Sequence, residues 1–181
     1  MVRKTIAMLV MLAMAAPLSA QGTGIFRMGP VFDDFGPYAL VETTDSLPAD
    51  AAFMHSFDVA EGADGEDRNR GFESAARFVN MHAAAGVPLD NIDLAVVVHG
   101  GAVRDLLTDE ARAARDFGEV NPSGAMVREM LDAGVRFIVC GQSMAGSNVG
   151  PDDLIPGVEI ALSAMTAHAL LQQQGYTVNP F

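Results

Sequence analysis

The chain has 181 residues, which is enough for one domain with a full core and too few for two. Its composition is that of a soluble globular protein, since 50% of the residues are hydrophobic and 19% are charged. The net charge of −12 repels phosphate backbones and anionic lipid head groups, so the composition argues against nucleic acid and membrane surfaces as partners.

The first twenty residues have the layout of a secretory signal peptide. Arg3 and Lys4 precede an apolar run from Ile6 to Ala16, and small residues follow up to a predicted cleavage site after Ala20. Neither this run nor any later one is long enough to cross a bilayer, so we expect no membrane span in the mature chain. Cleavage removes two basic residues and moves the net charge from −12 to −14. We therefore predict a periplasmic or secreted protein.

Residues 21–48 are predicted to form an N-terminal arm. The segment is rich in glycine, proline and aspartate, with Gly29-Pro30 and Gly36-Pro37 as turn signals, and it has room for one short strand at residues 38–41. The remainder, residues 49–181, is predicted to be a single domain.

Strand and helix patterns alternate along residues 49–181. The strand patterns lie at residues 51–59, 91–98, 135–139, 158–162 and 176–178. The helix patterns lie at residues 69–86, 106–117, 121–134 and 163–174, with Asn69 and Ser163 as N-caps and Pro122 at a first helical position. Residues 143–156 are expected to be a loop with one helical turn at 152–155. This order predicts right-handed parallel βαβ units, and hence a three-layer α/β domain around a five-stranded, mostly parallel sheet.

Cys140, the only cysteine, stands at the end of the buried strand pattern Val135–Val139. Because ligands bind at the carboxyl ends of strands in open α/β sheets, we expect Cys140 at the mouth of a crevice. Gly141 allows a sharp turn, and Gln142 and Ser143 bring neutral hydrogen-bonding groups beside the sulfur. A lone cysteine in an exported protein indicates a reactive thiol or an intermolecular disulfide. The alternative is an inert, buried thiol that packs as a small apolar residue.

His99 occupies the same type of position as Cys140, because it follows the strongest strand pattern, Leu94–Val98. Gly100 and Gly101 come next, but they lack both the dinucleotide fingerprint and the P-loop lysine, so we expect no nucleotide site. A structural histidine is the alternative to a functional one. Two candidate ligands are too few for a zinc site, and we predict neither a metal nor a cofactor.

Several segments together resemble the DsrE/DsrF-like family of small sulfur-relay proteins, which includes DsrE and TusD. The resemblance extends from about Phe53 to Tyr176. It is carried by the segments Phe57-Asp58-Val59, Ala76-Arg77-Phe78-Val79-Asn80, Val97-Val98-His99-Gly100-Gly101-Ala102, Asn121-Pro122, Val139-Cys140-Gly141-Gln142-Ser143, Pro156-Gly157-Val158 and Leu171-Gln172-Gln173-Gln174-Gly175-Tyr176. The resemblance implies a flavodoxin-like fold, assembly into a homo- or hetero-oligomer such as a trimer or hexamer, and a cysteine that carries sulfur as a persulfide. Of the two kinds of assembly we predict the homo-oligomer. We assign the role of sulfur carrier to Cys140 alone.

The signal peptide departs from the cytoplasmic members of this family and points to an exported branch. Our first hypothesis is an exported sulfur carrier that resembles a sulfurtransferase rather than a turnover enzyme, with sulfur donor and acceptor proteins as partners. In this hypothesis Cys140 holds sulfane sulfur, within a pocket formed by His99, Gly100, Gly101, Gly141, Gln142 and Ser143. The second hypothesis is a non-catalytic oligomeric module that binds a small ligand or metal through Cys140 and His99. The third is a structural protein with an inert thiol.

Overall fold

Five parallel strands form the central sheet of the computed structural model, which describes residues 25–180. The predicted signal peptide, residues 1–20, lies outside the described residues. The strands are β3 (Phe53–Val59), β4 (Ile92–Val98), β5 (Arg136–Cys140), β6 (Glu159–Ala161) and β7 (Thr177–Asn179), in the spatial order β6-β5-β4-β3-β7. The prediction of a five-stranded, mostly parallel sheet is confirmed.

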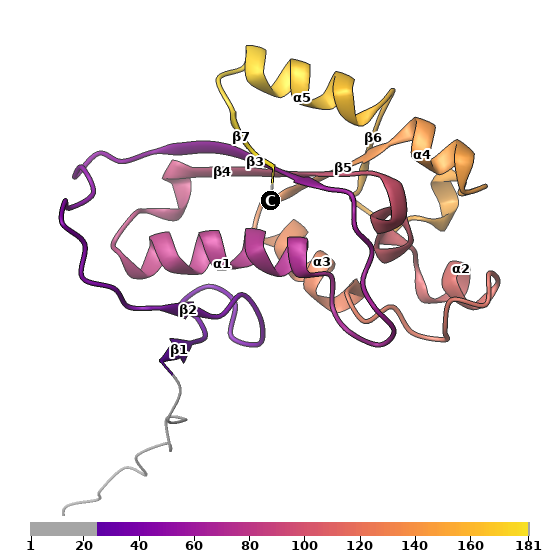
Figure 1. Cartoon of the computed structure of the whole chain (residues 1–181), viewed down its shortest axis with the longest axis horizontal. Coiled ribbons are helices and arrows are strands. Elements are labelled where there is room, and N and C mark those ends of the chain that lie inside the picture. Colours follow the sequence, from indigo (N-terminus) through magenta and orange to yellow (C-terminus); the bar gives the residue numbers. More distant parts are fainter. Residues whose placement is uncertain (1–24, 181) are drawn as a thin grey trace, which may run out of the picture.

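Helices cover both faces of this sheet, which gives the predicted three layers (Figure 1). The helices α1 (Arg70–Ala84) and α3 (Gly124–Asp132) lie on one face, and α5 (Ala164–Gln173) lies on the other. The shorter α-helices are α2 (Asp109–Ala113) and α4 (Gly141–Gly146). The 3₁₀ turns are η1 (Leu89–Asn91), η2 (Gly100–Leu106) and η3 (Pro151–Asp153). This arrangement confirms the α/β fold class.

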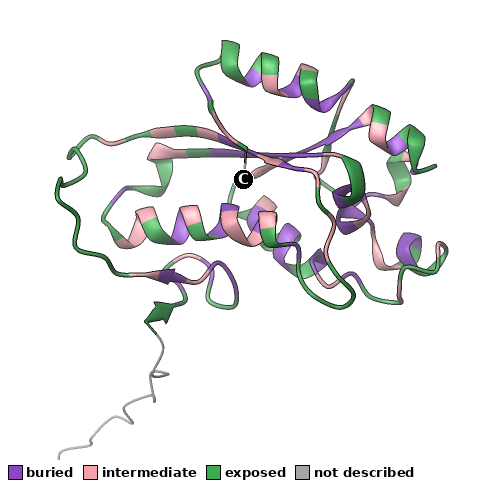
Figure 2. Cartoon of the chain, viewed as in Figure 1, coloured by how far each residue is buried: buried purple, intermediate pink, exposed green. Residues whose placement is uncertain are grey.

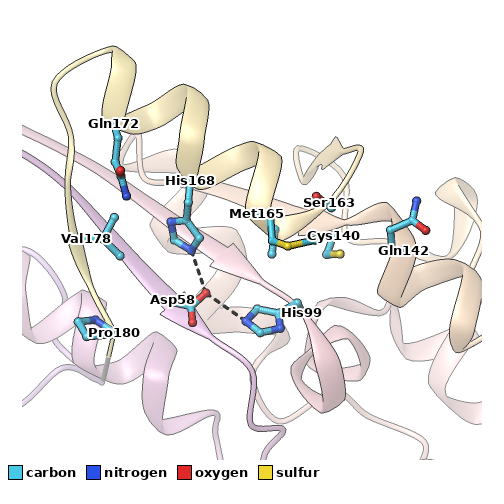
Figure 3. A pocket seen from close by; sticks show the side chains of 11 residues that line it. Asp58, His99, Cys140, Gln142, Ser163, Met165, His168, Gln172, Val178 and Pro180 are labelled. Carbon is cyan, nitrogen blue, oxygen red and sulfur yellow. Dashed lines mark hydrogen bonds and ion pairs between the residues drawn. The ribbon is translucent and has the colours of Figure 1, made fainter.

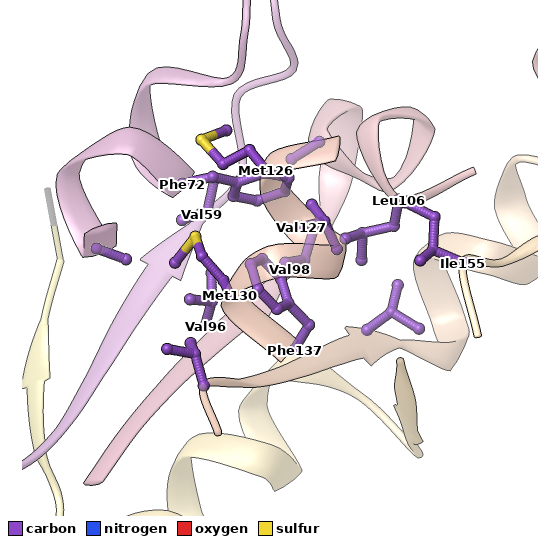
Figure 4. Close-up of a cluster of buried hydrophobic side chains, with 14 of the residues drawn as sticks. Val59, Phe72, Val96, Val98, Leu106, Met126, Val127, Met130, Phe137 and Ile155 are labelled. Atoms are coloured by element: carbon purple, nitrogen blue, oxygen red, sulfur yellow. The ribbon is translucent and has the colours of Figure 1, made fainter. Parts of the chain in front are cut away.

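The central strands are buried on both faces (Figure 2). Val96 and Val98 of β4 point into the larger core, where they meet Phe72 of α1 and Met130 of α3 (Figure 4). The alternate residues of β4 and β5 point to the opposite face and form a smaller core against α5, made of Ala95, Val97, Ile138, Cys140, Ala164, Ala167, Leu171 and Tyr176. Because side chains alternate along a strand, this register places Cys140 on the α5 face of the sheet.

Both predicted N-caps are present. The side chain of Asn69 accepts hydrogen bonds from the N–H groups of Gly71 and Phe72, and that of Ser163 accepts one from Thr166. These bonds satisfy backbone donors that have no partner within the helix, so they define where α1 and α5 begin.

The start of α3 differs from the prediction. The helix begins at Gly124 after Ser123, whereas Pro122 lies in a turn. The cause is Asn121, whose side chain accepts the N–H of Ser123 and donates to two backbone carbonyls of the preceding segment. These bonds hold a turn before the helix, because a short amide side chain competes with the helical backbone for hydrogen bonds.

The segment after β5 also differs from the prediction. Residues 143–156 are predicted to be a loop with one helical turn at 152–155. The turn is present as η3 at Pro151–Asp153, but α4 begins directly after Cys140 and runs to Gly146. Glycine is needed at the first position of α4, because a Cβ atom on Gly141 would lie 2.8 Å from the carbonyl oxygen of Ala161. The helix is six residues long, which is too short to show an apolar period in the sequence.

The arm contains a small antiparallel pair, β1 (Phe26–Arg27) and β2 (Tyr38–Ala39), within the predicted segment 21–48. The strand expected at residues 38–41 is therefore present but shorter. Within residues 25–180, no helix has the length and apolar character needed to cross a membrane.

The side chain of Asn80 anchors the arm to α1. It is fully buried, accepts the N–H groups of Val31 and Phe32, and donates to the carbonyls of Phe32, Phe35 and Gly36. Such a bonded amide satisfies the backbone of a buried turn that has no strand partner. The arm is thereby part of the domain surface on the face away from α5.

Candidate functional site

The strand register brings three functional side chains to one edge of the sheet. Val98 of β4 pairs with Val139 of β5, so His99 and Cys140 follow at neighbouring strand ends. On the other side of β4, Asp58 of β3 pairs with Val97. Because side chains alternate, Asp58, His99 and Cys140 all emerge on the face that α5 covers.

These side chains line a cavity of about 530 Å³ between the sheet edge and α5 (Figure 3). From α5 and its N-cap come Ser163, Ala164, Met165, His168 and Gln172, and from the other elements come Gln142, Val178 and Pro180. The cavity lies at the carboxyl ends of the strands, where open α/β sheets bind ligands.

The sulfur of Cys140 lies among hydrogen-bond donors. The residue is only 5% exposed, and this burial raises the pKa of the thiol. The hydroxyl of Ser143 and the backbone N–H groups of Ser143, Ala164 and Gln142 act in the opposite direction and together lower the pKa below its usual value. Donors favour the thiolate because they replace the water that burial removes. Hydrogen-bond donors from the first turns of α4 and α5 thus surround the sulfur and stabilise its anion.

Ser143 also connects the two strand ends. Its Oγ accepts a hydrogen bond of 3.1 Å from the backbone N–H of Gly100, the residue after His99. Gly100 has a φ of +55°, a backbone conformation that glycine adopts readily. The chain around His99 is therefore tied to the group that bonds the sulfur.

The residues predicted to shape the pocket have different positions. His99 and Gln142 line the cavity together with Cys140, whereas Ser143 and Gly100 act through the bonds just described. Gly141 is not among the lining residues and packs instead against the carbonyl of Ala161. Gly101 is not among them either, and it approaches the backbone of Gly62 in the loop after β3.

Two residues of the site were not identified from the sequence. The Oδ1 atom of Asp58 accepts hydrogen bonds from Nε2 of His99 at 3.1 Å and from Nε2 of His168 at 2.8 Å (Figure 3). The Nδ1 atom of His168 is buried and has no hydrogen-bond partner. A carboxylate that accepts from both rings fixes the Nε2–H tautomer in each neutral imidazole. The sequence signal was a charged residue at a strand end and a histidine on a helix face that is otherwise apolar.

The arrangement does not form a metal site in the described part of the chain. Among residues 25–180, no group of three or more His, Cys, Asp or Glu side chains is placed to hold a metal ion. The carboxylate of Asp58 instead accepts hydrogen bonds from both His99 and His168. The site chemistry is therefore that of a thiol, a carboxylate and two imidazoles.

Fold and site define a class of small three-layer α/β proteins with a hydrogen-bonded thiol at the carboxyl edge of a parallel sheet. The sequence profile of the DsrE/DsrF-like family matches residues 54–180, and the chain belongs to this family. No curated protein matches the chain.

Two solved structures are similar to this chain, each at 21% identity over 70% of its length. One is a protein of unknown function from Methanobacterium thermoautotrophicum, 96% of which is covered, with a TM-score of 0.48. The other is the ychN protein from E. coli, 98% of which is covered, with a TM-score of 0.49.

Proposed function

We propose that this protein is an exported sulfur carrier that holds sulfane sulfur as a persulfide on Cys140. The observation that carries the proposal is the set of donors from Ser143, Gln142 and Ala164 around the buried sulfur. The thiolate is the form that attacks sulfur–sulfur bonds, and these donors stabilise it without a metal. Membership of a family associated with sulfur relay supports the same chemistry.

The cavity beside Cys140 suits this role. A volume of about 530 Å³ has room for a second sulfur atom and for a small donor molecule. Because the thiol is only 5% exposed, a persulfide at this position would be shielded from bulk oxidants. These features support a carrier that loads and releases sulfur rather than a turnover enzyme.

A sulfur carrier needs partners that supply sulfur to it and accept sulfur from it. We expect sulfur donor and acceptor proteins, and assembly of the chain into a homo-oligomer such as a trimer or hexamer. The cavity rim offers an apolar contact surface, since Met165 is 80% exposed and Leu162, in the link between β6 and α5, is 72% exposed. Exposed apolar side chains grouped beside a site are typical of partner contacts. Export is proposed from the signal peptide, residues 1–20.

Intact mass spectrometry tests the proposal. The mature protein is measured before and after incubation with inorganic polysulfide, with and without a reductant, beside the variant Cys140→Ser. We expect the native protein to gain one or more sulfur masses that the reductant removes, and the variant to gain none. Equal gain in the variant, or no gain in a folded native protein, would end the sulfur-carrier proposal.

A second candidate is a non-catalytic module that binds a small ligand. The convergence of Asp58, His99 and His168 on one cavity favours it, since a few convergent polar groups in an otherwise apolar pocket are typical of ligand sites. The same mass experiment separates the candidates, because a binding module would leave Cys140 without added sulfur.

A further inference from the structure

We propose that His99 is the general acid of sulfur transfer at Cys140, and that Asp58 and His168 position its imidazole. The inference rests on the proposed sulfur chemistry of Cys140 and adds the group that protonates the departing sulfur. Three observations carry it: the strand register, the bonds to Asp58, and the different burial of the two imidazoles.

The register places His99 beside Cys140. The two residues directly follow the paired positions Val98 and Val139, and adjacent strands lie about 4.8 Å apart. Ser143 fixes this relation, because its hydroxyl bonds the Cys140 sulfur and its Oγ accepts the N–H of Gly100. Both side chains line the same cavity, so a molecule bound there can meet both.

Asp58 determines which ring atom of His99 can exchange a proton. Its Oδ1 accepts the Nε2–H of His99 at 3.1 Å, which leaves Nδ1 to gain and lose the second proton. A carboxylate in this position orients the imidazole and stabilises its protonated form during proton transfer. Asp58 thus acts through His99 and is a positioning residue.

His168 bonds the same carboxylate as His99, but its imidazole is more deeply buried. Its side chain is 16% exposed, against 30% for His99, and its Nδ1 is buried without a partner. Its bond to Asp58, at 2.8 Å, instead holds the carboxylate from the α5 side. The described titratable groups at the cavity are Asp58 from β3, His99 after β4, Cys140 of β5 and His168 of α5. Both imidazoles line the cavity, and His99 is the better placed to exchange a proton with a ligand because it is the more exposed of the two.

The transfer step balances without an oxidant or reductant. With a small organic hydropersulfide as donor, the Cys140 thiolate attacks the outer sulfur, a bond forms between Sγ and that sulfur, and the sulfur–sulfur bond of the donor breaks. The electron pair leaves on the inner sulfur, which takes the proton from Nδ1 of protonated His99. The products are the hydropersulfide of Cys140, a free thiol and neutral His99.

The need for an acid depends on the leaving sulfur. An alkyl thiol has a pKa of about 8.5, so its thiolate leaves poorly at neutral pH unless it is protonated as it departs. A leaving group whose charge is delocalised away from sulfur, such as pyridine-2-thiolate, needs no proton on the departing sulfur, because its ring nitrogen takes a proton from water and the product is the thione. The dependence of rate on leaving group therefore reports on His99 separately from access to Cys140.

The test uses two neutral disulfides that undergo the same sulfur–sulfur cleavage by Cys140. Bis(2-hydroxyethyl) disulfide releases an alkyl thiol, whereas 2,2′-dithiodipyridine releases a stable thione. Rates of Cys140 modification are measured by intact mass for the native protein, for His99→Gln and for Asp58→Asn. His82→Gln is the matched control, because His82 lies on α1 and outside the cavity.

We expect His99→Gln to slow the alkyl disulfide about 100-fold, at the lower end of general acid effects, and to change the pyridyl reaction less than about threefold. Asp58→Asn should show the same selective loss to a smaller extent, and His82→Gln should leave both rates unchanged. Equal slowing of both reagents, or no slowing of either, overturns the role of His99 while leaving Cys140 as a carrier. A native thiol that reacts with neither reagent would overturn the carrier proposal itself.

Discussion

Replacement of Ser143 by alanine tests the hydrogen bonds to the Cys140 sulfur. The sulfur accepts from four donors of Ser143, Gln142 and Ala164, and the substitution removes one of them, the Ser143 hydroxyl. A hydrogen bond to a charged group contributes about 1.5–3 kcal/mol, so the thiolate fraction at neutral pH should fall about 10- to 100-fold. The remaining thiolate is more nucleophilic because its pKa is higher, which recovers about half of this loss on a logarithmic scale. We therefore expect alkylation to slow about 3- to 10-fold.

The assay is the rate of alkylation by iodoacetamide, followed by intact mass from mildly acidic to alkaline pH. The pKa of Cys140 is lowered in the native protein, so the native protein should react faster than the variant below both thiol pKa values. Above both pKa values the order should reverse, because the variant's thiolate is the more nucleophilic. Ser147→Ala is the matched control, since Ser147 lies just after the far end of α4 and is exposed. Equal or faster alkylation of Ser143→Ala at neutral pH, with the fold intact, would refute the reasoning.

Three further predictions concern the stability of the domain. Gly141→Ala places a Cβ atom 2.8 Å from the carbonyl oxygen of Ala161, so urea unfolding should show a loss of about 1–3 kcal/mol, and unchanged stability would contradict the close contact. Asn80→Ala leaves buried backbone groups of the arm without partners, so the free energy of unfolding should fall by about 3 kcal/mol, whereas a loss below about 1 kcal/mol would show that the arm is not anchored there. Burial and the positive charge of His82 lower the pKa of His55, so the folded state resists protonation and stability declines as the pH falls below about 6.5. On acidification the melting temperature of His82→Gln should fall less than that of the native protein. An equal fall would exclude an effect of the His82 charge on His55.

The strands were predictable from the sequence because their burial leaves a direct pattern. The run Leu94–Val98 is apolar at every position, and the structure buries all five residues between two helical layers. The N-caps Asn69 and Ser163 were also predictable, because a short polar side chain just before an apolar helix pattern typically marks the start of a helix. Local chemistry thus specified most of the fold.

The site was predictable only in part, because its assembly depends on which strands are neighbours. Cys140 and His99 could be placed at strand ends, but only the order β6-β5-β4-β3-β7 makes those ends adjacent. Asp58 and His168 are 110 positions apart, and their contact depends on how α5 crosses the sheet. The donors around the sulfur depend on α4, and its six residues are too few to show a helical hydrophobic pattern in the sequence.

The most direct test of the central claim is transfer of sulfur from loaded Cys140 to a second thiol. The protein is loaded with sulfane sulfur, freed of excess donor and mixed with a small acceptor thiol, and both species are followed by mass. A sulfur carrier should lose its added sulfur mass from Cys140 while the acceptor gains a matching amount of sulfane sulfur. Retention of the added sulfur by the protein, or loading at positions other than Cys140, would contradict the account.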